Sequence, residues 1–132
     1  MIFVDTSFFV AMLLAKDPRH PEAAELANRH SGAGWVTTNH VAGESWSYLR
    51  RRAGHGTAVA FLDAVEASPR VHVVYVPEKL EAEALSWLRR HDEREYSFVD
   101  ATSFATMRRE RLTAALAFDG DFTAAGFTEL RA

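Results

Sequence analysis

The sequence contains no cysteine, which excludes a disulfide scaffold, a thiolate zinc site and a cysteine nucleophile. Its longest uninterrupted apolar run covers residues 8–15, far short of the roughly 18 residues that indicate a membrane span. No lysine or arginine precedes this run, so the basic start of a secretory signal is missing as well. We therefore expect a protein of the cytoplasm without a membrane segment.

An excess of positive charge is also missing. The chain has 15 Lys and Arg against 18 Asp and Glu, a net charge of −3, whereas a typical nucleic-acid-binding domain is strongly basic. This balance does not exclude nucleic acid, because acids that bind a metal ion no longer repel phosphate. Apart from Lys16 and Lys79 every basic residue is arginine, which favours bidentate contacts to carboxylate or phosphate.

Several catalytic motifs are absent too. There is no G-x-S-x-G elbow and no Walker A loop, and residues 54–56 lack the third glycine of a dinucleotide-binding fingerprint. None of the six histidines forms an i, i+3 or i, i+4 pair, which disfavours zinc.

What the chain does contain is an alternation of short apolar strands and helices over 132 residues, 48% of them hydrophobic, which predicts a single domain over residues 1–132. Such alternation predicts an α/β fold, with a mostly parallel sheet covered by helices on both faces. The expected strands are residues 2–4, 35–38, 71–76, 112–118 and 127–130. The expected helices are residues 6–14, 22–30, 41–52, 57–67, 78–91 and 97–109, with a helical turn near residue 122.

Four acids fall at the carboxyl edge of this predicted sheet, where ligands bind in parallel α/β folds. Asp5 and Asp119 directly follow predicted strands, whereas Glu44 and Asp100 lie in the first turns of helices. Asp121 follows two residues after Asp119, at the rim. Each acid also has a purely structural interpretation: Asp5 as a helix N-cap, Asp100 in a capping box, Glu44 as an exposed first-turn acid, Asp119 in a turn.

The surroundings of Asp100 indicate a functional site more strongly than those of the other acids. Its predicted helix is apolar around nearly the whole circumference, which indicates burial, and Arg94 is the only basic residue within seven positions. A buried carboxylate must be protonated, paired or bound to a metal. Clustered carboxylates repel one another unless a cation is bound, and hard ions such as Mg²⁺ or Mn²⁺ suit an all-oxygen site.

Four segments resemble the PIN-domain ribonucleases, above all the VapC-type toxins of toxin–antitoxin pairs. They are Ile2-Phe3-Val4-Asp5-Thr6-Ser7, Thr37-Thr38-Asn39-His40-Val41-x-x-Glu44, Tyr96-Ser97-Phe98-Val99-Asp100-Ala101-Thr102-Ser103-Phe104 and Ala117-Phe118-Asp119-x-Asp121-Phe122. This resemblance implies a three-layer α/β/α sandwich and a metal-dependent endoribonuclease that acts as the toxin of a type II toxin–antitoxin system. It also implies one or two Mg²⁺ or Mn²⁺ ions, an RNA substrate, a cognate antitoxin and a homodimer.

The resemblance carries the family's acidic residues to this chain, for catalysis and metal binding alike: Asp5, Glu44, Asp100 and Asp119. Supporting positions would be Thr6, the hydroxyl after the first acid, and Asn39. Asp121 stands where other members often carry His, so it is an outer-shell or second-metal candidate.

Arg50, Arg51 and Arg52 form one of three basic clusters, each at the C-terminal end of a predicted helix. There they would either stabilise the helix dipole or bind RNA phosphates, although such helix ends are expected to point away from the acidic edge. Trp46 and Trp87 are expected to be core or interface residues rather than stacking platforms.

Strand-end acids also occur in two other classes of protein. A receiver-like phosphoryl-transfer domain would need a second acid beside Asp5 and a suitably placed lysine. This chain has neither. A non-catalytic metal-binding module that regulates through a protein partner remains open, because it needs the same acids.

Overall fold

The centre of the structure is a five-stranded, all-parallel sheet with the strand order β3-β2-β1-β4-β5. The computed structural model describes all 132 residues. The strands are β1 (Ile2–Val4), β2 (Trp35–Thr38), β3 (Val71–Val74), β4 (Ala114–Leu116) and β5 (Thr128–Glu129). The helices are α1 (Thr6–Leu13), α2 (His20–Arg29), α3 (Asn39–Ala53), α4 (His55–Ala67), α5 (Glu78–Arg90), α6 (Phe98–Glu110) and α7 (Asp121–Ala124).

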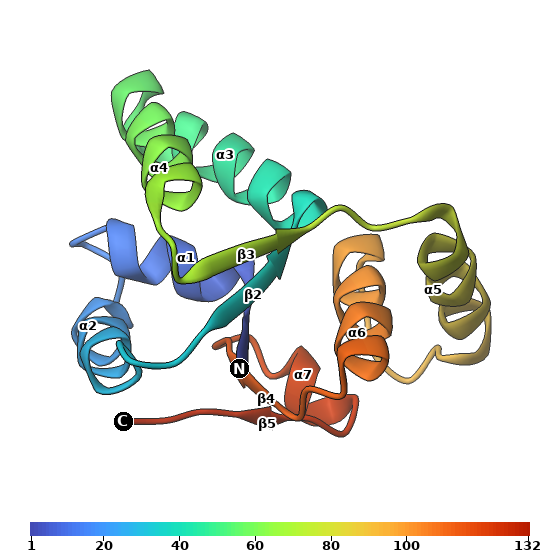
Figure 1. Cartoon of the computed structure of the whole chain (residues 1–132). Helices are drawn as coiled ribbons and strands as arrows, with labels where there is room; N and C mark the ends of the chain where they lie inside the picture. The colour runs from blue at the N-terminus through green and yellow to red at the C-terminus, as the bar shows by residue number, and fades with distance from the viewer.

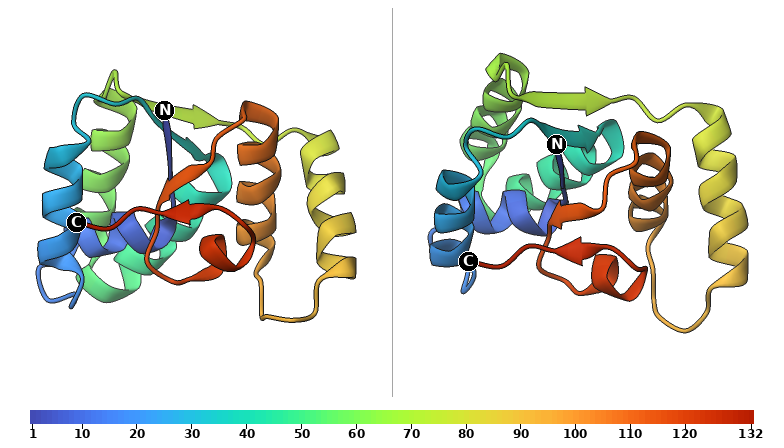
Figure 2. Two further views of the ribbon diagram at one scale, coloured as in Figure 1. Left: turned by 90° about the horizontal axis from the view of Figure 1, so that it is seen from below. Right: turned by 60° about the horizontal axis from the view of Figure 1, so that its bottom comes forward.

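Helices cover both faces of the sheet. Figure 1 and the two views of Figure 2 show α1 to α4 on one side and α5 to α7 on the other. The predicted three-layer α/β/α arrangement is confirmed. Because all five strands are parallel, their carboxyl ends lie along the same edge.

Polar residues at the strand ends start the helices that follow. Asp5 is the N-cap of α1, where its carboxylate accepts a hydrogen bond from the Ser7 N–H. The Thr38 hydroxyl caps α3 by accepting from the Val41 N–H at 3.1 Å. A side-chain cap of this kind typically stabilises a helix by about 1 kcal/mol.

The Thr38 cap corrects the predicted position of Glu44. Because α3 begins at Asn39 rather than at residue 41, Glu44 lies beyond the first turn of the helix. The linker predicted at residues 54–56 is also shorter, because α4 begins at His55, directly after Gly54. Gly54 has a φ of +93°, a conformation that favours glycine, and this single residue turns the chain between the two helices.

Strand β3 ends at Val74 and not at residue 76 as predicted. Val74 pairs with Thr38, the last residue of β2, so no partner strand remains beyond it. The Asn39 side chain takes over the pairing, because its Oδ1 accepts a hydrogen bond from the Val76 N–H at 2.9 Å. Strand β4 is likewise shorter than predicted, covering 114–116 instead of 112–118.

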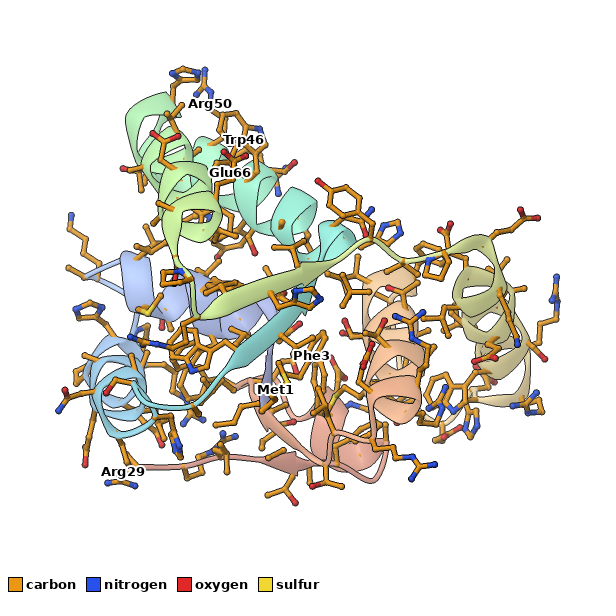
Figure 3. All side chains as sticks on the ribbon, viewed as in Figure 1. Met1, Phe3, Arg29, Trp46, Arg50 and Glu66 are labelled. Atoms are coloured by element: carbon orange, nitrogen blue, oxygen red, sulfur yellow. The ribbon has the colours of Figure 1, made fainter.

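The core lies on both faces of the central strands. Phe3 of β1, labelled in Figure 3, is fully buried and packs against Phe122 with ring centroids 5.8 Å apart. Phe8 of α1 and Phe104 of α6 are fully buried as well. Burying such a side chain contributes about 1.5–3 kcal/mol, so the strand ends are fixed by well-packed elements. None of the helices has the length and apolar character that a membrane crossing requires.

Candidate active site

Carboxylates converge where β1, β4 and α6 meet. Asp5 directly follows β1, Asp119 lies just beyond the end of β4, and Asp100 lies in the first turn of α6. Carboxylate oxygens of Asp100, Asp119 and Asp121 lie within 4.8 Å of one another. Asp5 is close enough to Asp119 and Asp100 for both to repel its negative charge. The fold therefore gathers at one edge three of the four acids that the sequence singled out, together with Asp121.

Asp5 is the most deeply buried acid of the group, with 2% of its surface exposed. Burial, followed by repulsion from Asp119, raises the pKa of Asp5 to about 8. Ser7 orients the carboxylate, because its Oγ donates to Asp5 Oδ2 at 2.8 Å. The same Oγ accepts from the Phe118 N–H at 2.9 Å, which ties the first acid to the segment that leads into Asp119.

Asp100 forms the predicted capping box. Its Oδ2 accepts from the Ser97 N–H and its own N–H donates to Ser97 Oγ, both at 3.0 Å. The residue is nonetheless only 7% exposed, and burial raises its pKa to about 7 despite these hydrogen bonds. The capping role and a place in the acidic cluster therefore coexist, because only one carboxylate oxygen bonds to Ser97.

Asp119 and Asp121 flank a tight turn at Gly120, which has a φ of +83°. Asp119 is exposed as a residue, yet loss of water around its carboxylate raises its pKa. Asp121 differs because it pairs with Arg94, whose guanidinium also donates to the Asp119 carbonyl at 2.9 Å. A Cβ on residue 120 would come within 3.0 Å of this guanidinium, so the glycine also makes room for Arg94.

A buried acid that the sequence did not single out stabilises this turn through hydrogen bonds. The side chain of Glu129 is 1% exposed, pairs with Arg131 at 2.9 Å and accepts from the N–H groups of Gly120 and Thr123. Although burial opposes the charged form, these donors keep the pKa of Glu129 below its ordinary value. The only signal in the sequence was an acid beside an arginine at the end of a predicted strand.

Glu44 lies farther out than the other acids. It is exposed and lines a cavity of about 730 Å³, which we call the main cavity, together with Asp5 and Asp119. Ser47, Tyr48 and Arg51 line the same cavity from α3. With Glu44 they are spaced by three or four residues, which places them on one side of the helix.

Of the three predicted RNA-binding arginines, only Arg51 lines the main cavity. Figure 3 shows Arg50 at the outer end of α3, away from the sheet. Arg52 lies over the Tyr48 ring, 5.0 Å from its centroid. The expectation that helix ends point away from the acids is therefore wrong for Arg51, because α3 packs along α1 and brings its later turns past Asp5.

The supporting positions differ from each other. Thr6 lines the main cavity, and its buried Oγ1 has no hydrogen-bond partner. Asn39 is not brought to the acids, since its side chain holds the segment after β3. Trp46 and Trp87 are partly buried and pack against the core, and neither lines the main cavity.

The donor set fits a hard divalent cation. It consists of carboxylate oxygens, without a histidine or a cysteine, and such oxygens are the ligands that Mg²⁺ and Mn²⁺ prefer. Burial, with repulsion from neighbouring aspartates, raises the pKa values of Asp5 and Asp100. A cation bound here would favour the ionised form of both carboxyls.

A family model, curated relatives and a solved structure all indicate the same family. The PIN domain family model matches residues 2–128. The 23S rRNA-specific endonuclease VapC20 from two strains of Mycobacterium tuberculosis, CDC 1551 and H37Rv, is 54% identical over 132 residues, covering 99% of this chain and 98% of theirs. The crystal structure of M. tuberculosis VapC20, described as a sarcin–ricin loop cleaving toxin, superposes with a TM-score of 0.94 at 52% identity and full coverage of both chains.

Proposed function

Because the chain belongs to the PIN-domain family, we propose that it is a metal-dependent endoribonuclease that acts as the toxin of a type II toxin–antitoxin pair. The observation that carries this proposal is the convergence of Asp5, Asp100 and Asp119 at one edge of the sheet, beside a cavity large enough for a nucleotide. The whole of residues 1–132 would act as one domain, in the cytoplasm.

The substrate we propose is 23S rRNA, cleaved in its sarcin–ricin loop. The support is the identity of 54% to an endonuclease named for that RNA, spread over almost the whole of both chains. A cognate antitoxin would inhibit the enzyme, and the active form would be a homodimer, as the family resemblance implies.

Asp5, Asp100 and Asp119 would hold one or two Mg²⁺ or Mn²⁺ ions, with Glu44 completing the shell directly or through water. A bound ion lowers the pKa of a water molecule and polarises the phosphoryl oxygens. Ser7 fixes the orientation of Asp5 through its hydroxyl donation, and the capping box fixes Asp100. Glu44, which is exposed and lines the main cavity, would orient the attacking water.

Asp121 would act as an outer residue of this site. Its carboxylate lies beside Asp100 and Asp119 but is already paired with Arg94. It would therefore orient bound water or contribute to a second ion, for which Arg94 would have to release it. Thr6, with a free buried hydroxyl, would support the Asp5 side of the site.

The test is cleavage of purified ribosomal RNA by the antitoxin-free protein with Mg²⁺ or Mn²⁺. We expect one dominant cut in 23S rRNA that requires the metal and is lost with EDTA. Mapping the new RNA ends identifies the loop. A folded protein that binds Mn²⁺ but leaves all RNA intact would contradict the proposal and favour the non-catalytic regulatory module.

Arg51 gives a separate prediction on RNA binding. It lines the main cavity together with Asp5, Glu44 and Asp119, so its guanidinium would bind a phosphate near the cut. Arg51→Gln is expected to weaken RNA binding about three- to tenfold for every sequence and to reduce the slope of log affinity against log salt by about 1. Fluorescence anisotropy over a salt series measures both.

Arg50→Gln is the matched control, because Arg50 is a neighbour on the same helix that does not line the main cavity. It should leave affinity and salt slope nearly unchanged. Equal effects of the two substitutions would show that only the overall charge of this helix end matters.

A further inference from the structure

A second cavity opens beside the main cavity. It measures about 540 Å³ and lies between the segment after α1 and the C-terminal half of α3. The two cavities share Asp17 and Tyr48, so they are adjacent to each other at these side chains. We call it the side cavity; the lining residues that matter here are Leu13, Leu14, Lys16, Tyr48 and Arg52.

The lining of the side cavity combines apolar side chains with two cations, Lys16 and Arg52, and one carboxylate, Asp17. Leu13 is 38% exposed, and the Tyr48 side chain is partly exposed. The Arg52 guanidinium stands over this ring at 5.0 Å. Neither Arg52 nor Lys16 forms a salt bridge, so both cations are free to bind an anion.

These properties match the chemistry of a nucleotide. A nucleobase has apolar faces that stack on aromatic rings and on guanidinium planes, and its phosphates need cations. We propose that the side cavity binds one unpaired base of the RNA substrate, next to the cleaved phosphodiester, with the base stacked on the Tyr48 ring in place of the Arg52 guanidinium. This inference rests on the proposed function and adds where the substrate is held.

The position of Tyr48 favours RNA over a protein as the occupant. Glu44, Tyr48 and Arg51 follow one another on the same side of α3, so a strand whose phosphate lies at the acids passes Tyr48 directly. Lys16 and Arg52 then lie along its continuation.

The test measures binding of a synthetic hairpin that contains the sarcin–ricin loop of 23S rRNA. All proteins carry Asp100→Asn so that the RNA stays intact, and Mg²⁺ is present. Tyr48→Ala is expected to weaken binding at least about tenfold, whereas Tyr48→Phe, which keeps the ring, stays within about twofold. Tyr75→Ala is the matched control, because Tyr75 is 77% exposed and lines neither cavity. Circular dichroism melts establish that each variant is folded.

A second series locates the base. Hairpins with one abasic nucleotide each are titrated with the Tyr48 and the Tyr48→Ala protein. At one position, removal of the base should weaken binding to the Tyr48 protein about as much as Tyr48→Ala does, and should cost the Ala variant nothing further. At all other positions the two effects should add.

The inference is overturned if Tyr48→Ala binds the hairpin as tightly as the Tyr48 protein, or if no abasic position is coupled to it. Normal RNA binding with a loss of antitoxin binding would assign the side cavity to the protein partner and also overturn the inference. If the wild-type protein neither binds nor cleaves the RNA, the proposed function fails. That result differs from one in which the wild type cleaves and Tyr48 makes no difference.

Discussion

Asp100→Asn is expected to slow RNA cleavage by at least about a thousandfold. The substitution keeps an oxygen that can accept from the Ser97 N–H, so the start of α6 should be preserved. It removes one negative charge from the group of oxygens that lie within 4.8 Å of one another. Loss of a metal ligand removes several kcal/mol of charge stabilisation from the transition state, and each 1.4 kcal/mol corresponds to a factor of ten in rate.

The same substitution should stabilise the metal-free protein. Burial raises the pKa of Asp100 to about 7. At pH 8 the carboxyl is ionised, and this negative charge costs more free energy in the folded protein than in the unfolded chain. Asparagine removes this penalty, and we expect a gain of about 1–2 kcal/mol, or roughly 5 °C in Tm. Loss of activity through unfolding would move Tm in the opposite direction.

Gel quantification of the cleaved RNA and a thermal melt in EDTA provide the two measurements. Asp63→Asn, an exposed aspartate on α4, is the matched control and should change neither quantity. An Asp100→Asn protein that retains more than a tenth of the wild-type rate would remove Asp100 from the metal site.

The second large effect is a dependence of metal binding and stability on pH. The pKa values of Asp5, about 8, and Asp100, about 7, both lie above the ordinary 3.8. Between pH 4 and 8 the folded, metal-free protein therefore binds more protons than the unfolded chain. Raising the pH through these two pKa values lowers the contribution of Asp5 and Asp100 to the free energy of unfolding, and the loss is complete only at about pH 9, one unit above the pKa of Asp5.

A bound cation should reverse this trend, because it stabilises the ionised carboxylates and displaces their protons. At pH 8.5 we expect saturating Mn²⁺ to raise Tm by several degrees more than at pH 5.5. Calorimetric titrations at pH 6.5, in buffers of different ionisation enthalpy, should show between one and two protons released from Asp5 and Asp100 together when the site is filled. A pH-independent Tm shift without proton release would contradict the assignment of Asp5 and Asp100 as ligands.

Much of this architecture was predictable because acids in a parallel sheet stand out by their position. Asp5 follows a short β-prone run, and Asp100 lies on a helix with no polar face. The capping box at Ser97 formed as expected, and the resemblance to VapC-type PIN domains is confirmed. The position of these acids could be predicted without the order of the strands, because the carboxyl ends of all parallel strands lie at the same edge of the sheet.

The rest required knowledge of how distant elements pack. That Arg51 and Tyr48 line the cavity depends on the packing of α3 along α1, which no local pattern reveals. Asn39 was expected beside the acids. Because β3 ends early, the Asn39 side chain instead accepts a hydrogen bond from the Val76 N–H. Glu129 reaches Gly120 only because β5, a strand of two residues at the edge of the sheet, pairs with β4.

The place of β1 in the sheet has a consequence for synthesis of the protein. β1, at residues 2–4, is synthesised long before β4, at residues 114–116, although the two strands are neighbours in the sheet. Until then the edge of β1 beside Asp5 has no partner, and the turn at Gly120 lacks the Glu129 that holds it. The carboxylates are therefore assembled only once the residues up to Glu129 have left the ribosome. A nascent chain that stops short of this point has no completed site.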